Sequence, residues 1–158
     1  MAEVGVTTTP GGAAYPVTVH TLELQVRTGD VERVVDLTGR CAEFLRGAGA
    51  RDGLLNVFVP HATAGVAVLE TGAGSDDDLL AALAELLPRG GPGGSGWRHR
   101  HGTPGHGRDH VLPALVPPAT TLPVVGGQLA LGTWQSVCLV DTNVDNAVRT
   151  VRLSYLAG

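Results

Sequence analysis

Four of the six histidines of this chain lie in one short stretch, WRHRHGTPGHGRDH, which spans residues 97–110. They are His99, His101, His106 and His110, and glycines and one proline separate them. A neutral imidazole is the commonest metal ligand among side chains, so this stretch can present several nitrogen atoms to one ion. The same composition also suits a solvated loop whose histidines bind nothing. Two interpretations therefore start from this stretch: a metal site and an exposed loop.

A fifth histidine, His61, stands directly after Pro60 between two apolar segments. At such a strand end the side chain can point into a cleft, although a buried histidine bonded to a backbone carbonyl is the simpler alternative. With His99 and His110 it would give three imidazoles from separate elements, which is an open site with room for water or substrate. Zinc, nickel, copper and ferrous iron all suit such ligands. We expect a divalent ion, zinc or another transition metal that prefers imidazole.

Three charged residues are candidates for catalytic roles. Glu70 ends an apolar segment, and it is an exposed strand end, a general base, or a carboxylate that orients a histidine. Asp141 and Arg149 flank the polar segment TNVDNAV. Arg149 could hold a phosphate through paired N–H donors, or it could form half of a surface ion pair.

The composition indicates one globular domain. The chain has 158 residues, of which 43% are hydrophobic and 16% charged, with a formal net charge of -4 and no lysine. A basic face for nucleic acid is not expected, and no apolar run reaches the length of a membrane span. Two cysteines, Cys41 and Cys138, do not make a disulfide framework, so we expect a cytoplasmic protein. Residues 1–15 resemble a flexible N-terminal leader, and residues 16–158 a single domain.

Hydrophobic patterning predicts an α+β fold, with an antiparallel or mixed sheet covered on one side by two or three helices. A parity slip near Thr21 suggests a bulge in the first strand or two abutting strands. Ser75 is expected to cap a helix whose first turn carries three aspartates, and Asp109 to cap a short helix ending at Leu115. The predicted strands cover residues 15–28, 31–37, 54–60, 62–70 and 148–156, with a hairpin from 121 to 141 around Gly126-Gly127; the predicted helices cover 38–49, 75–88 and 109–115.

Several motifs, taken in order, resemble the YjbQ family, small proteins often described as secondary thiamine-phosphate synthase enzymes. The chain carries PHATA from Pro60, an aromatic-x-His motif at Trp97 to His99, and a second histidine eleven positions later at His110. It then carries GTWQ from Gly132 to Gln135, followed by Asp141 and an arginine eight positions further on. The resemblance covers roughly residues 16–156.

The resemblance implies an α+β fold that assembles as a homotrimer, with sites near subunit boundaries. It assigns metal or active-site roles to His61, His99 and His110. It also implies a weak thiamine-phosphate synthase activity, which joins a pyrimidine methyl diphosphate to a thiazole phosphate.

The chain departs from the family pattern at three places. It reads Glu70-Thr71-Gly72-Ala73 where family members commonly carry Glu-Asn-x-Asp, and Asp141 replaces the usual glutamate. His106 stands where asparagine or aspartate is common, so it is expected to join or replace a metal ligand. The function expected is therefore a metal-assisted transferase acting on a small phosphorylated molecule. The alternative is a non-catalytic protein that binds a metal or a small anion.

Overall fold

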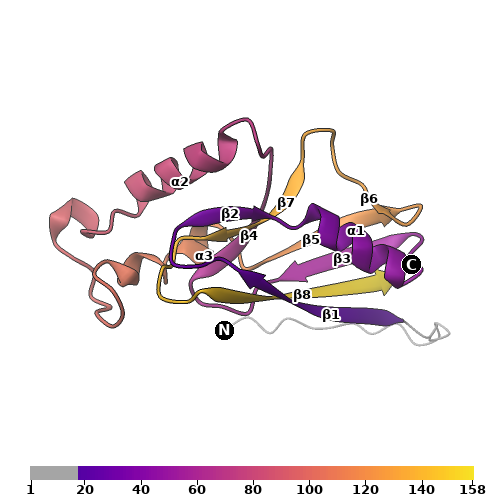
Figure 1. The fold of residues 1–158 in the computed structure, drawn as a ribbon, viewed down its shortest axis with the longest axis horizontal. Coiled ribbons are helices and arrows are strands. Elements are labelled where there is room, and N and C mark those ends of the chain that lie inside the picture. The colour runs from indigo at the N-terminus through magenta and orange to yellow at the C-terminus, as the bar shows by residue number, and fades with distance from the viewer. Residues whose placement is uncertain (1–17) are drawn as a thin grey trace, which may run out of the picture.

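The computed structural model describes residues 18–158 as two antiparallel sheets with helices packed against them (Figure 1). The larger sheet has the strand order β1 (Val19–Arg27), β8 (Val148–Ala157), β3 (Gly53–Phe58), β5 (Ala119–Val125) and β6 (Gln128–Leu129). The smaller sheet has the order β2 (Arg33–Asp36), β7 (Ser136–Asp141) and β4 (Ala64–Leu69). The expected α+β class with antiparallel strands is confirmed. The leader predicted over residues 1–15 lies outside the described residues.

The main core lies between the two sheets. Leu55, Val57 and Leu153 of the larger sheet pack with Val66 and Leu139 of the smaller one, and none of these side chains is more than 2% exposed. Helix α1 (Thr38–Gly47) adds Cys41 and Leu45 to the same core. The sequence analysis expected one sheet with helical cover; instead a second sheet buries the inner face of the first.

A second core lies on the other face of the smaller sheet. Helix α2 (Ser75–Leu86) and helix α3 (Leu112–Leu115) pack there, and Leu83 and Leu112 meet Val140 of β7. Because β7 points Val137 and Leu139 into one core and Val140 into the other, it is buried on both faces. This explains its continuous apolar run. The hairpin predicted around Gly126-Gly127 is present, since β5 pairs with the two-residue β6, but its second arm ends at Leu129 and β7 joins the smaller sheet.

Other local expectations also need correction. Strand β1 pairs with β8 without interruption from Val19 to Arg27, so it has no bulge, and the parity slip arises because Val19 faces outward and is 55% exposed. Helix α2 is preceded by Gly74 with a φ of 97°, and Ser75 lies inside the helix without capping it. Asp109 does not cap α3, because its buried carboxylate bonds side chains of another loop.

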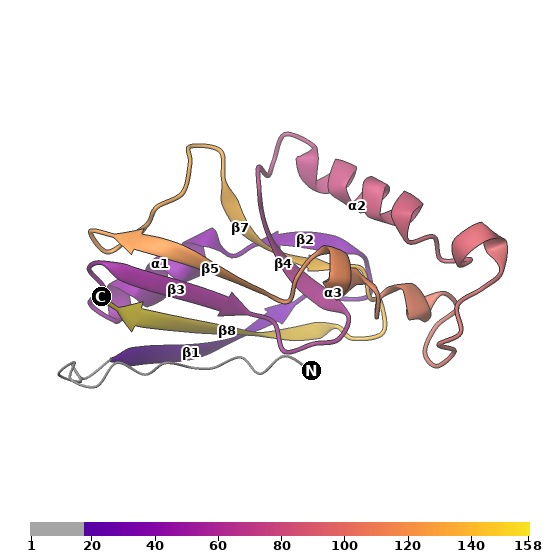
Figure 2. The ribbon, with the colours of Figure 1, turned by 180° about the vertical axis from the view of Figure 1, so that it is seen from behind.

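The long segment between α2 and α3 lies at one end of the molecule, at the opposite end from the C-terminus (Figures 1 and 2). At this end the register places Ala64, the first residue of β4, opposite Asp141, the last residue of β7. Strand β8 begins nearby after the β7–β8 loop, and short 3-10 turns span Pro92–Gly94 and His106–Arg108. No helix in the described part of the chain has the length and apolar character needed to cross a membrane.

Candidate metal centre

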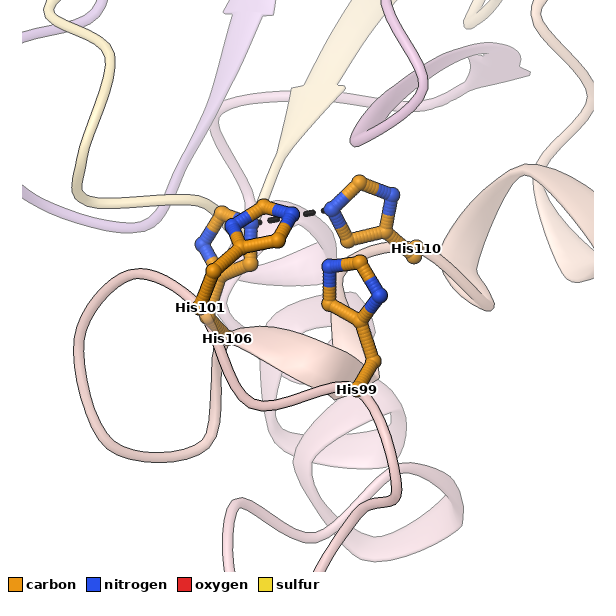
Figure 3. A group of neighbouring side chains, drawn as sticks. All are labelled: His99, His101, His106 and His110. Carbon is orange, nitrogen blue, oxygen red and sulfur yellow. Dashed lines mark hydrogen bonds between the residues drawn. The ribbon is translucent and has the colours of Figure 1, made fainter.

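Four imidazole rings meet at this end of the molecule. His99 and His101 lie on the loop before the 3-10 turn, His106 opens that turn, and His110 follows it (Figure 3). One nitrogen from each of the four rings lies within 4.8 Å of the other three. The centroids of the His99 ring and the His110 ring are 4.2 Å apart, and those of His99 and His101 are 4.0 Å apart. The loop therefore folds back on itself and gathers its histidines.

Glycines make this folding possible. Gly102 has a φ of 78°, and a Cβ atom there would lie 2.7 Å from the His106 ring. A Cβ atom at Gly107 would lie 2.5 Å from the Cβ of Trp97 and 2.8 Å from the carbonyl oxygen of His99. Side chains at these two positions would therefore separate the histidines, which gives a physical reason for glycine beside them.

His106 is the buried and anchored member of the cluster. Its Nδ1 atom lies 2.5 Å from the carboxylate of Asp145 and 2.9 Å from the amide nitrogen of Asn143. When Nδ1–H donates to Asp145, the Nε2 lone pair is left free, and it faces Nε2 of His110 at 2.9 Å. A carboxylate behind a histidine is the usual device that fixes a metal-binding imidazole in one tautomer and orientation.

A buried polar network joins the histidine loop to the β7–β8 loop. Asp109 accepts hydrogen bonds from Thr142 at 2.8 Å and from Asn143 at 3.2 Å. Burial raises the pKa of Asp109. The hydrogen bonds from the two donors and the charges of the nearby arginines lower it, but by less than burial raises it. The oxygen of the Asn143 amide in turn accepts the backbone N–H of Asp145 and of Asn146. The position of Asp145 behind His106 is thus fixed from both sides.

Electrostatics within the cluster favour neutral rings. Desolvation and the neighbouring imidazoles lower the pKa of both His99 and His110. A proton on one ring would repel a proton on the next, and a neutral ring is the form that binds a metal. The donor set contains four imidazoles and no carboxylate or thiolate, which fits nitrogen-preferring transition metals better than magnesium or calcium.

The distances also fit a single ion. In a tetrahedral zinc site, where each bond is about 2.0–2.1 Å long, two bound imidazole nitrogens lie about 3.4 Å apart. A pair of nitrogens at the observed limit of 4.8 Å would therefore approach by about 1.4 Å, or roughly 0.7 Å per ring, on binding one ion. His99 and His101 are exposed loop residues, so they have the freedom to make such shifts.

His61 lies beside this group and is not one of its four members. It lines a cavity of about 340 Å³ together with His106, His110 and Arg149. Its Nε2 atom accepts the backbone N–H of Thr150 at 2.9 Å, which occupies one of its two nitrogens. Burial and the charge of Arg149 lower its pKa. The structure thus brings His99, His106 and His110 together with His101, and places His61 at the adjoining cavity wall.

Asp141 and Arg149 form a buried ion pair. Two bonds of 2.7 Å join the Arg149 guanidinium to the two carboxylate oxygens of Asp141, and neither residue is more than 1% exposed. The pair is therefore not a surface pair. Arg149 also lines the 340 Å³ cavity, whereas Asp141 does not.

Glu70 lies away from the histidines. It is exposed just after β4, whose last residue Leu69 pairs with Ser136, while the first residue Ala64 pairs with Asp141 near the cluster. The strand separates these ends by roughly 17 Å at about 3.3 Å per residue. Within one chain, Glu70 cannot act as a base on a ligand held by the histidines.

Asp145 and Asn143 are the site residues that the sequence analysis missed. Both belong to TNVDNAV, whose polar character between two buried strands was the available signal. A cluster of asparagine and aspartate next to a strand end suits turns as well as ligand sites, so spacing gave no reason to connect it with His106.

Comparison with known proteins agrees with this architecture. The family model described as UPF0047 protein YjbQ-like matches residues 22–158. The chain belongs to this family. The UPF0047 protein of Mycobacterium bovis is 58% identical over 126 residues, which cover 80% of this chain and 93% of that protein. The UPF0047 protein YugU of Bacillus subtilis is 30% identical over 119 residues, covering 72% and 83%.

Solved structures from other organisms share the fold. A hypothetical protein from Aeropyrum pernix superposes with a TM-score of 0.78 at 36% identity, over 88% of this chain and 99% of that one. A YjbQ-like protein of unknown function from Sulfolobus solfataricus superposes with a TM-score of 0.77 at 22% identity, covering 90% of this chain and 100% of that one. The second likeness concerns the fold alone.

Proposed function

We propose that this YjbQ-like protein binds a divalent transition-metal ion through His99, His101, His106 and His110, and uses it in a transfer reaction on a small phosphorylated molecule. The convergence of four imidazole nitrogens within 4.8 Å, one of them backed by Asp145, carries the proposal. An ion held there would supply positive charge to a phosphoryl oxygen or to a leaving diphosphate.

The 340 Å³ cavity beside the cluster is the proposed substrate site. Its wall offers the imidazoles of His106 and His110, the hydroxyl-bearing Thr63, the amide-bearing Asn146 and the cation Arg149. Thr63, Asn146 and Arg149 can donate hydrogen bonds to the oxygens of a phosphate ester and keep it next to the histidines, which hold the metal ion. His61 stands on the same wall as a neutral base with one nitrogen already occupied.

The metal content of the purified protein tests the proposed metal binding. Purified protein should carry about one zinc, nickel, copper or iron ion per chain by elemental analysis. The His99→Ala and His110→Ala variants should lose most of it, while His20→Ala, a histidine on β1 outside the cluster, should keep it. Equal metal content in all four proteins, or none in any, would contradict the proposal.

The reaction itself needs a separate assay. Thiamine-phosphate synthesis is the candidate: the pyrimidine methyl carbon loses diphosphate and bonds to the thiazole nitrogen. Metal-loaded protein should form thiamine phosphate above the level of His110→Ala. A loaded protein that forms none would favour the non-catalytic alternative, in which the same site only holds the ion or an anion.

We also propose a homotrimer in a reducing cytoplasm. Among residues 18–158, strand β1 has β8 as its one paired neighbour, and several apolar side chains on the larger sheet are exposed, including Leu54 at 44% and Val125 at 63%. A neighbouring chain would cover such surface. Cys41 and Cys138 are buried free thiols, and burial raises the pKa of each to about 12, so neither is reactive. Sedimentation should give three times the mass of the chain at micromolar concentration; a monomer would contradict the assembly.

A further inference from the structure

The segment that carries the histidines is strongly basic within an acidic protein. Between residues 86 and 108 the sequence has four of the chain's 11 arginines and no aspartate or glutamate, although the chain as a whole has a net charge of -4. The histidine cluster alone does not account for these arginines, because a divalent cation gains nothing from positive neighbours.

Part of this segment encloses a second cavity next to the histidine cluster. The cavity has a volume of about 270 Å³, and His99 forms part of its wall, whereas His61, His106 and His110 line the 340 Å³ cavity instead. Gly102 lines both, so the two cavities meet at the histidine loop. The wall of the smaller cavity is formed by Arg89, Gly96, Trp97, His99, Arg100 and the loop from Gly102 to Gly105.

Hydrogen bonds and close packing hold the residues of this cavity wall in place. The indole N–H of Trp97 donates to the carbonyl oxygen of Pro88 at 2.9 Å, which fixes the ring. Arg89 donates to one oxygen of Glu32 from Nε at 3.2 Å and from Nη2 at 2.6 Å. Gly105 packs so tightly over Arg89 that a Cβ atom there would lie 2.8 Å from the Cβ of Arg89.

Arg89 and Arg108 share one carboxylate at this wall, and Arg100 forms no ion pair within residues 18–158. The buried Arg108 donates to the other oxygen of Glu32 at 2.8 Å, so one carboxylate serves two guanidinium groups. Asp109 lies 3.5 Å from Nε of Arg108, yet that buried nitrogen has no hydrogen-bond partner among residues 18–158. Arg100 lines the cavity and forms no ion pair within residues 18–158, whereas Asp145, which accepts the N–H of the wall residue Thr103, is already held by His106.

We propose that this 270 Å³ cavity is an anion subsite that takes the phosphate or diphosphate group of a ligand, with Arg100 and Arg89 as its cationic contacts. Guanidinium groups bind phosphate oxygens through paired N–H donors. The volume is below the roughly 300–1,000 Å³ of pockets for drug-sized molecules, so it suits the charged group alone. The inference rests on the proposed function for its biological sense, since His99 lines this cavity and is also one of the proposed metal ligands.

Binding of inorganic pyrophosphate to protein stripped of metal with a chelator, measured by calorimetry at fixed ionic strength, tests the subsite. Arg100→Gln should weaken binding at least tenfold, and Arg98→Gln less than twofold. Arg98 is the matched control, because it is exposed and belongs to the same basic segment but does not line the cavity. Equal weakening by both variants would mean diffuse attraction by the segment and would overturn the subsite.

Two further measurements distinguish this inference from the metal proposal. Malonate, a dicarboxylate, should bind at least tenfold more weakly than pyrophosphate, and equal affinity would overturn the assignment to phosphate. Arg100→Gln should keep the metal content of the unmodified protein. A protein that binds metal but no pyrophosphate, loaded or stripped, overturns the subsite and leaves the metal site standing. Pyrophosphate binding that is lost only in Arg100→Gln supports the subsite even if no metal is found.

Discussion

At the scale of single residues, His106 owes its place to a carboxylate 39 positions later in the chain. The hydrogen bond from Nδ1 to Asp145 decides which nitrogen of the ring is free, and it makes that nitrogen more basic. Within residues 18–158, no side-chain hydrogen bond holds the exposed ring of His99 or of His101. The metal affinity of the site should therefore depend more on Asp145 than on any other residue outside the four histidines.

Asp145→Asn should therefore weaken metal binding about 10–100-fold, the range typical of such supporting carboxylates. The amide is the same size, so the fold and the melting temperature of the metal-free protein should change little. Asp30→Asn, in the exposed turn after β1, is the control. Competition titration with a chromogenic chelator measures the affinity. Unchanged affinity in Asp145→Asn would show that Asp145 does not position His106 on the ion.

A second residue-scale prediction concerns His61 and pH. Its Nε2 atom must be unprotonated to accept the N–H of Thr150, and burial with the Arg149 charge lowers its pKa in the folded protein. The unfolded chain, in which histidine has a pKa of about 6.5, then binds this proton more readily. Stability is therefore fully present above that pH and falls as pH decreases toward the folded-state pKa.

Melting temperatures of metal-free protein between pH 8 and 5.5 check this. His61→Gln keeps a hydrogen-bond acceptor that does not titrate, so its melting temperature should fall less steeply below pH 6.5 than that of the unmodified protein. All other residues are the same in the two proteins, so the difference between the two curves reports on His61 alone. Parallel curves would contradict the prediction.

At the scale of elements, the histidine loop is shaped by glycine as much as by its ligands. Gly107 lacks a positive φ, so alanine there is not strained by its backbone conformation, but its Cβ atom would meet Trp97 and the His99 carbonyl oxygen at less than 3 Å. Gly107→Ala should destabilise the protein by about 1–3 kcal/mol, as overpacking does, and should weaken metal binding by moving His99.

Gly90→Ala is the matched control. Gly90 belongs to the same segment, a Cβ atom added there would have no neighbour within 4 Å, and its φ is not positive. Denaturant unfolding and metal titration of both variants measure the two effects. A Gly107→Ala protein as stable as Gly90→Ala would mean that the loop relaxes freely and does not hold the histidines in place.

The elements also show what the sequence could and could not predict. His99, His106 and His110 could be grouped because they are close in the chain and the glycines between them allow a compact loop. Asp145 could not be, since its link to His106 depends on how β7 and β8 deliver their connecting loop. Likewise, Glu70 looked like a site residue beside His61 in the sequence, but a straight β4 carries it to the far end of the sheet.

At the scale of the whole molecule, the division of strands between two sheets was hidden because β7 follows β6 closely in the chain. The turn from Gly132 to Gln135, closed by the bond of the Gly132 N–H to the Gln135 side chain, sends β7 into the other sheet. The continuous apolar run of β7 was the signal for burial on both faces, and alternation is the pattern that a hairpin with one solvated face would have shown.

The buried pair of Asp141 and Arg149 joins these two sheets, because Asp141 ends β7 in the smaller sheet and Arg149 lies on β8 in the larger one. Removal of one partner leaves a buried charge without compensation, which typically costs about 3–5 kcal/mol. Arg149→Met alone should therefore destabilise the chain by that amount in urea unfolding. The double variant Arg149→Met with Asp141→Leu should recover much of the loss, because neither charge is then buried alone. If Arg149→Met instead unfolds like the unmodified protein, the pair does not stabilise the contact between the two sheets and matters only for ligand binding.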